Sequence, residues 1–227
     1  MIVRKIDPIV SSFKRVNGSR LTLRIDKQAN VVISAPLKMA ISDINNFIDE
    51  KRDWIEKTRQ KIIENQAPKR LFNDGDTIPF LGIERRINIL PNYKYAAEFL
   101  DGKFNLSSNI QPQAKEYLSR LFKNLAWNHF APRIHYLAKQ YNFKFKAVKI
   151  SSAQTKWGSC SNHGNINLAW RLVMAPEDVI DYVIIHELAH TVEANHSHKF
   201  WKIVENIIPD YKQKRQWLKD NGKYLDL

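Results

Sequence analysis

The chain has 227 residues, 44% of them hydrophobic, and a formal net charge of +13. This composition can fill the core of one domain or two small ones and excludes a disordered chain, and no apolar run approaches the roughly 20 residues that cross a bilayer. The first ten residues carry charges at Arg4, Lys5 and Asp7, so we expect neither a secretion signal nor a membrane anchor. Cys160 is the single cysteine, which excludes an internal disulfide, so a soluble cytoplasmic protein is expected.

The positive charge is spread over both halves of the chain, without a basic tail. A charge of +13 attracts polyanions, so a nucleic-acid or nucleotide partner stays open beside the simpler interpretation of a generally basic protein. The oligomeric state is not indicated.

The first segment is predicted to form strands. Residues 13–16, 21–26 and 31–36 alternate apolar and polar side chains, as half-buried strands do. Asn17-Gly18 is a tight-turn signal, so we expect antiparallel strands of a small sheet.

A helical pattern follows from Ser42 to Asn65, with Ser42 as the expected N-cap and Pro68 ending it. Trp54 and the basic residues after it invite a nucleic-acid interpretation. An amphipathic helix with a solvated charged face accounts for them more simply.

A second set of strands is expected at residues 77–81, 85–90, 97–100 and 103–106. Asn73-Asp74-Gly75-Asp76 resembles a calcium loop at first sight, but it lacks the remaining oxygen ligands, so a turn is the better interpretation. Residues 1–108 are therefore predicted to form an antiparallel, β-rich N-terminal lobe with one long helix.

Residues 107–112 are the expected linker to a second domain, residues 109–227. A long helical pattern then runs to Tyr141, and Pro132 should kink or divide it. His129 and His135 are six residues apart, on different faces of a helix, so we expect structural roles for both.

Residues 146–151 and 165–170 are predicted strands, joined through a turn at Trp157-Gly158-Ser159-Cys160-Ser161. Pro176 then starts a helix, with Glu177 and Asp178 near its positive end.

That helix carries the H-E-x-x-H sequence of His186, Glu187 and His190. Residues four apart share one face of a helix, so both imidazoles point to the same place and Glu187 lies one step round, in reach of a water there. Two neutral imidazoles with a carboxylate beside them are typical of a hydrolytic zinc site. Apolar residues at helical spacing should bury the opposite face: Val179, Ile180, Val183, Ile184 and Leu188.

The third metal ligand should follow soon after His190. Asn195 tolerates the left-handed conformation that ends helices, and Ser197 is a natural N-cap for the next one. A sharp turn here favours His196 as the ligand, while Glu193 and His198 compete for the role. Helices from residue 198 to about 208 and from about 211 should then pack behind the metal helix through Phe200, Trp201, Val204 and Trp217.

The run from His186 to His190, with Asn195-His196-Ser197, Phe200-Trp201 and Pro209-Asp210-Tyr211, resembles the YgjP-like metallopeptidases, small zincins related to the WLM and SprT-like families. A second block is also similar to that family: Lys156-Trp157-Gly158-Ser159-Cys160-Ser161, then Asn165-Ile166-Asn167-Leu168 and Arg171-Leu172-Val173-Met174-Ala175-Pro176.

The resemblance implies an α+β protein whose residues 109–227 form a small zincin-like domain of helices plus a small sheet. It implies one zinc ion bound by His186, His190 and His196, with Glu187 as the catalytic base. In zincins a strand beside the metal helix offers its edge to an extended substrate, and we expect residues 165–170 to be that strand.

The leading hypothesis is a zinc metallopeptidase acting on peptide or protein substrates. The alternatives are a metal-dependent nucleotide phosphohydrolase, a protease working on nucleic-acid-bound proteins, or a zinc-stabilised binding module without activity. Seven residues are candidates for contacts to the substrate or its transition state: His198, Arg171, Tyr211, Tyr182, Trp157, Asn165 and Asn167.

Overall fold

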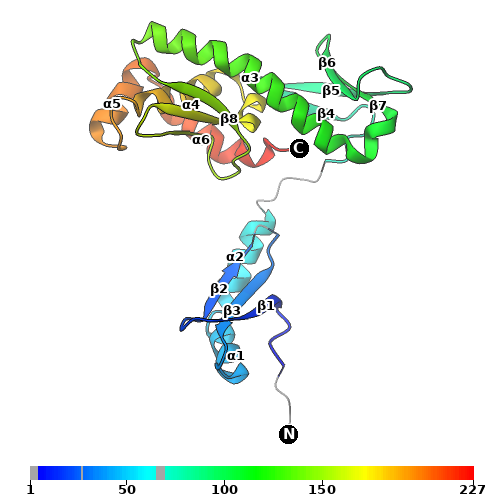
Figure 1. Ribbon diagram of the computed structural model, residues 1–227, viewed down its shortest axis with the longest axis vertical. Coiled ribbons are helices and arrows are strands. Elements are labelled where there is room, and N and C mark those ends of the chain that lie inside the picture. Colours follow the sequence, from blue (N-terminus) through cyan, green and yellow to red (C-terminus); the bar gives the residue numbers. More distant parts are fainter. Residues whose placement is uncertain (1–4, 27, 65–69) are drawn as a thin grey trace. The chain divides into compact units, whose positions relative to one another are not determined.

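The structure, a computed structural model, describes residues 5–26, 28–64 and 70–227. These residues form a mixed α/β protein, as expected, in two compact units, Met1–Ala67 and Pro68–Leu227 (Figure 1). The boundary lies far from residue 108, where the linker was expected. Strands that were predicted to belong to the N-terminal lobe share the core of the second unit instead.

The first unit contains β1 (Val10–Val16), β2 (Thr22–Ile25), β3 (Val31–Pro36), α1 (Ile41–Glu50) and α2 (Arg52–Glu64). The strand order is β1-β3-β2, and β1 runs parallel to β3. The prediction of an all-antiparallel sheet is therefore wrong for β1. The apolar strand β3 occupies the buried centre of the sheet, so β1 and β2 flank it and do not pair as a hairpin.

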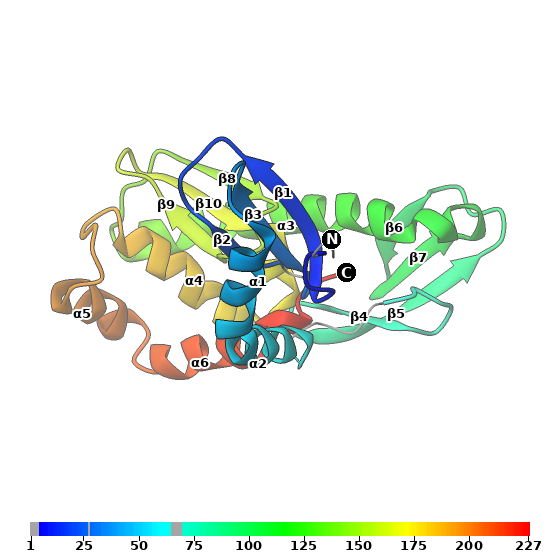
Figure 2. The ribbon, with the colours of Figure 1, turned by 90° about the horizontal axis from the view of Figure 1, so that it is seen from below.

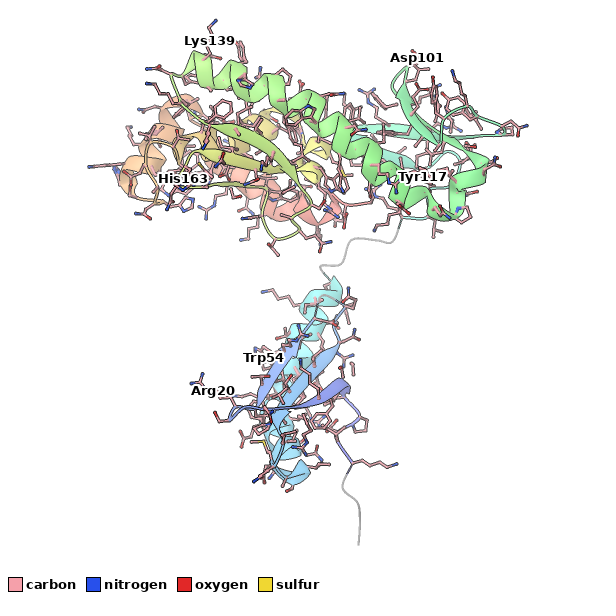
Figure 3. The ribbon with its side chains drawn as sticks, viewed as in Figure 1. Arg20, Trp54, Asp101, Tyr117, Lys139 and His163 are labelled. Carbon is pink, nitrogen blue, oxygen red and sulfur yellow. The ribbon has the colours of Figure 1, made fainter. Side chains whose placement is uncertain are left out.

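The predicted helix from Ser42 is two helices, divided at Lys51, and its N-cap is Ala40. Ile44, Ile48 and Ile55 lie fully buried in the core of this unit, which confirms the amphipathic pattern. Trp54 is half exposed on α2 (Figure 3), and Pro68 lies outside the described residues.

The second unit begins with the predicted strands, which the structure confirms. They are β4 (Thr77–Phe80), β5 (Ile83–Leu90), β6 (Ala97–Leu100) and β7 (Lys103–Ser107), in the order β4-β5-β7-β6. Asn73–Asp76 forms a turn in which the Asp76 carboxylate accepts from the Asn73 amide at 2.7 Å.

The expected linker is a short 3-10 helix, η1 (Ser108–Gln113), that leads directly into α3 (Ala114–Gln140). The Phe104 ring of β7 stacks on the Phe122 ring of α3, with a centroid separation of 5.0 Å. The centroids of the Phe122 and Trp170 rings are in turn 6.1 Å apart. This continuous aromatic core explains why no domain boundary falls near residue 108.

Helix α3 is not divided at Pro132, because buried side chains on either side of the proline, Phe130 and Ile134, hold it against the core. It runs the length of the second unit, from the β4–β7 sheet to the second sheet (Figures 1 and 2). His129 Nε2 lies 3.9 Å from Glu177 Oε1. The His135 ring packs on the Phe145 ring.

The remaining elements are β8 (Ala147–Ser151), β9 (Gly158–Cys160), β10 (Asn165–Ala169), η2 (Trp170–Met174), α4 (Glu177–Ala189), α5 (His198–Ile207), α6 (Tyr211–Asn221) and η3 (Gly222–Tyr224). The strand order is β8-β10-β9, and β9 lies beside α4 (Figure 2). Residues 165–170 were expected to supply the edge strand beside the helix, but β10 is the central strand, and β9 is the edge strand that lies beside α4. A three-residue strand inside the predicted turn gives no periodic signal of its own.

Among the helices of the described ranges, none has both the length and the apolar character needed to span a membrane.

Candidate active site

Helix α4 forms where the sequence predicts it. Pro176 is its N-cap, and Glu177 and Asp178 lie in its first turn, near the positive end of the helix dipole. The apolar face is buried in the core of the second unit through Val179, Ile180, Val183, Ile184 and Leu188. The helix ends at Ala189, so His186 and Glu187 lie in its last turn and His190 is its C-cap.

The Nε2 atoms of three histidines converge beyond the end of α4. His196 Nε2 lies 3.0 Å from His186 Nε2 and 3.2 Å from His190 Nε2. Among the described residues, these three are the group of His, Cys, Asp and Glu side chains placed to hold a metal ion. Glu193 and His198, the two competing candidates, are not part of the cluster.

The turn that brings His196 back is built from backbone hydrogen bonds. The Val192 and Glu193 amides donate to the Ala189 carbonyl at 3.0 and 2.9 Å. Asn195 has no left-handed conformation, contrary to the prediction. Ser197 caps α5 as predicted, with its hydroxyl accepting from the Phe200 amide at 3.3 Å.

The three histidines fit a tetrahedral zinc ion. Nitrogen ligands bind zinc at about 2.0–2.1 Å, which places them about 3.3 Å from one another in a tetrahedron. The observed Nε2 separations are close to that spacing. His190 Nδ1 lies 3.2 Å from the Glu193 carbonyl oxygen, and a hydrogen bond donated there leaves Nε2 free as a ligand.

Aromatic side chains of α5 support the histidine rings. Phe200 is fully buried, and its ring stacks on the His190 ring with a centroid separation of 4.4 Å. It makes edge contacts with the rings of His186 and His196, at centroid separations of 4.9 and 4.8 Å. Trp201 stacks on His196 at 5.6 Å, and Tyr211 stacks on Trp201 at 5.1 Å. The expected support by Phe200 and Trp201 is therefore confirmed.

Glu187 is a buried carboxyl group, 5% exposed, beside the histidines. Burial raises its pKa to about 7, and the nearby Lys156 only partly opposes this effect. Among the described residues, its Oε2 atom has no hydrogen-bond partner. It packs against β9 at Gly158, where a methyl group would lie 2.5 Å from Glu187 Oε1.

A cleft of about 520 Å³ contains the three histidines and Glu187, and β9 forms its opposite wall. The Ala169 amide donates to the Trp157 carbonyl, and the Ser161 amide to the Asn165 carbonyl, on the side of β9 that faces β10. Because hydrogen-bonded pairs alternate along antiparallel strands, Gly158 and Cys160 turn their amide and carbonyl groups away from β10. Within the described part of the chain no strand pairs with this edge of β9, which borders the cleft beside the histidine cluster.

The YgjP-like metallopeptidase domain model matches residues 19–221, most of the sequence. The chain belongs to the YgjP-like metallopeptidase family. Membership of a metallopeptidase family implies that the protein needs a divalent metal ion and acts on a peptide or protein substrate. The three clustered histidines agree with the need for a metal ion.

No curated protein matches the sequence. The crystal structure of the metallopeptidase zymogen of Pyrococcus abyssi abylysin is similar over 38% of this chain and 90% of that chain, with 26% identity and a TM-score of 0.34. A TM-score of this size does not establish a shared fold, so the YgjP-like match carries the family assignment.

Of the seven candidates for substrate contacts in this metallopeptidase, the structure brings two beside the cleft. Trp157 and Tyr182 line a neighbouring cavity that also contains His186 and Glu187. Burial raises the pKa of Tyr182 to about 12, so its hydroxyl stays a hydrogen-bond donor near neutral pH.

The other five lie outside the walls of both cavities. Arg171 forms an ion pair with Asp226 at 2.6 Å, and Tyr211 stacks behind Trp201. Asn165 and Asn167 belong to the central strand β10, and His198 is exposed at the start of α5.

Sequence reasoning missed two contributors to the site. Gly158 belongs to the sequence block from Lys156 to Ser161, but its proximity to Glu187 depends on the pairing of β9 with β10. Arg215 of α6, which lies 5.4 Å over the Trp201 ring, carried no motif at all.

Proposed function

We propose that this YgjP-like metallopeptidase is a zinc-dependent enzyme in which His186, His190 and His196 hold the metal and Glu187 is the general base. The observation that carries the proposal is the convergence of three Nε2 atoms, 3.0 and 3.2 Å apart, beside a buried carboxyl group. A structural zinc site normally has four protein ligands and leaves no position for substrate, whereas this cluster supplies three.

The donor set supports zinc as the metal. Three imidazoles are suitable ligands for zinc, and softer or harder ions prefer thiolate or oxygen ligands. Burial and the two neighbouring histidines lower the pKa of His186 to about 3, and burial lowers the pKa of His196. Both rings are therefore neutral at physiological pH, the form that binds metal. Zinc, when bound, supplies Lewis-acid chemistry that polarises a carbonyl group and makes water more acidic.

Glu187 is positioned to move the proton. Its carboxylate accepts a proton from the attacking water and then donates it to the leaving amine nitrogen. A base works best when its pKa is near the working pH, and in the metal-free protein burial raises the pKa of Glu187 to about 7. The Oε2 atom without a partner is available for this contact.

The edge of β9 is the proposed docking site for an extended substrate. The outward amide and carbonyl groups of Gly158 and Cys160 can pair with a peptide backbone, which would pass beside Glu187 and the histidines. This assigns to β9 the role that residues 165–170 were expected to have.

We assign the activity to the cytoplasm, because the single Cys160 suits a reducing compartment. Peptide substrates are favoured over nucleotides by the family match. The net charge of +13 is the observation behind a role on nucleic-acid-bound proteins, and DNA affinity that falls steeply with added salt would support that role.

The test compares wild-type protein with Glu187→Gln. Both should bind one zinc per chain, and wild type alone should cleave members of a peptide library. Full activity of Glu187→Gln, or cleavage of nucleotides but not peptides by wild type, would contradict the proposal.

A further inference from the structure

A second cavity, of about 340 Å³, opens beside the metal-binding cleft and shares Gly158, His186 and Glu187 with it. A substrate group that enters this cavity lies next to His186 and Glu187. On the proposed function, on which this inference rests, that group belongs to a substrate residue next to the bond that is cut.

The wall of the cavity is apolar and held in place. Trp157 and Leu218 line it together with Tyr182, which is 4% exposed. The Trp157 ring packs against the backbone at Gly222, where a methyl group would lie 2.8 Å from Cζ2. The methylene groups of a substrate side chain can pack on this surface.

Three cations line the same cavity: Lys156, Arg215 and Lys219. Across residues 5–26, 28–64 and 70–227, none of the three forms an ion pair with a carboxylate. The Arg215 guanidinium lies over the Trp201 ring, which orients it without neutralising its charge. Three cations on the wall of one cavity give it a positive potential that attracts an anion.

Cations also line the other end of the cleft, whereas the described residues of the central cleft include no Lys or Arg. A further cavity of about 360 Å³, at the other end, is lined by Lys144 and Lys146. Among the described residues that line these three cavities, Glu187 is the one acidic residue. A basic substrate side chain would therefore meet cations at either end of the cleft.

We propose that the cavity lined by Lys156, Arg215 and Lys219 binds a substrate carboxylate, so that the enzyme prefers an acidic residue beside the scissile bond. The carboxylate is supplied by a Glu or Asp side chain or by the C-terminus of the substrate. A Glu side chain fits best, because its methylenes pack on Trp157 while its carboxylate reaches the cations at the exposed end.

The first test measures cleavage by the full-length zinc protein of peptides that differ only at the residue beside the scissile bond, Glu, Gln or Lys. A hydrogen-bonded charge pair is worth about 10- to 100-fold, so kcat/KM should fall by that factor from Glu to Gln and further for Lys. Each peptide is made with a free and an amidated C-terminus. A preference that follows the free C-terminus, and not the side chain, would assign the cavity to the terminal carboxylate.

Charge reversal identifies the cavity. Lys219→Glu should lower the Glu-over-Lys preference by about 10-fold or more, because a repulsive charge replaces an attractive one. Lys139→Glu is the matched control, because Lys139 is exposed in the last turn of α3 (Figure 3) and lines none of these cavities, and the substitution makes the same change in net charge. It should leave the preference unchanged.

A binding measurement separates this inference from the proposed function. Peptide hydroxamates with Glu, Gln or Lys at the adjacent position report affinity for the zinc protein without turnover. Tighter binding of the Glu form by about 10- to 100-fold, weakened by Lys219→Glu, supports the cavity even if no peptide is cleaved. Equal affinities, or no binding of the Glu form, would overturn the inference, whereas cleavage of all three peptides at equal rates would overturn it and leave the proposed function standing.

Discussion

Gly158 leaves the space that the Glu187 side chain occupies: a methyl group on Gly158 would lie 2.5 Å from Oε1 and 2.6 Å from Cγ of Glu187. The edge strand and the proposed base therefore fit together only because residue 158 has no side chain. The position of Glu187 is thus determined from two sides, by α4 that carries it and by β9 that covers it.

Gly158→Ala should displace the Glu187 carboxyl group and lower kcat/KM for peptides by at least about 100-fold, because misplacement of a catalytic group by 1 Å costs that much. Zinc binding should persist, since the three atoms nearest to the added methyl group all belong to Glu187 and not to the histidines. Gly18→Ala is the control, because a methyl group there meets nothing closer than 3.9 Å. Wild-type activity in Gly158→Ala would show that β9 does not constrain Glu187.

His196→Ala should abolish stoichiometric zinc binding, measured by metal analysis after dialysis. Loss of one of three ligands should cost more than the 10- to 100-fold that loss of a second-shell partner costs. His198→Ala is the matched control, since it removes an exposed histidine two residues away that is outside the cluster. Equal zinc content in both variants would rule out His196 as a ligand.

Phe200→Ala should destabilise the protein by about 3–5 kcal/mol, because it empties a fully buried site behind three imidazole rings. Phe200→Leu, which keeps most of the apolar volume, should cost less. Denaturant unfolding of the metal-free and zinc-bound forms measures both. A gain in stability on zinc binding that is the same in wild type and Phe200→Ala would show that Phe200 does not position the histidines.

Glu187→Gln should stabilise the metal-free protein at alkaline pH. The pKa of Glu187 in the folded protein is about 7, above the ordinary value of 4.5. Ionisation of the buried carboxyl group therefore lowers the free energy of unfolding as the pH rises from 4.5 to 7. Above pH 7 this decrease in the free energy of unfolding is on the order of 3 kcal/mol, and below pH 4.5 it vanishes.

Urea unfolding of metal-free wild type and Glu187→Gln at pH 4.5 and pH 8 measures this difference. The variant should gain stability at pH 8 and little at pH 4.5. Glu193→Gln serves as the control, because residue Glu193 is only half-buried. A gain that is equal at both pH values would show that the Glu187 carboxyl is not buried in the metal-free protein.

The local elements around the site follow from short-range patterns in the sequence. Helix α4, the cap at Ser197 and the strands β4 to β7 were all predicted, because hydrophobic periodicity and capping act over a few residues. The convergence of His186 and His190 was predictable for the same reason, since residues four apart share a helix face.

Other features depend on contacts between distant segments. The parallel pairing of β1 with β3, the boundary after Ala67 and the central position of β10 arise from which surfaces pack together, and no local pattern encodes that. The proximity of Gly158 to Glu187, and of Arg215 to the histidine cluster, likewise requires the folded arrangement of β9, α4 and α6. Types and spacing of residues were sufficient to predict a metal site, but the strand that borders it and the charges around it come from long-range packing, because side chains remote in sequence meet only when the core closes.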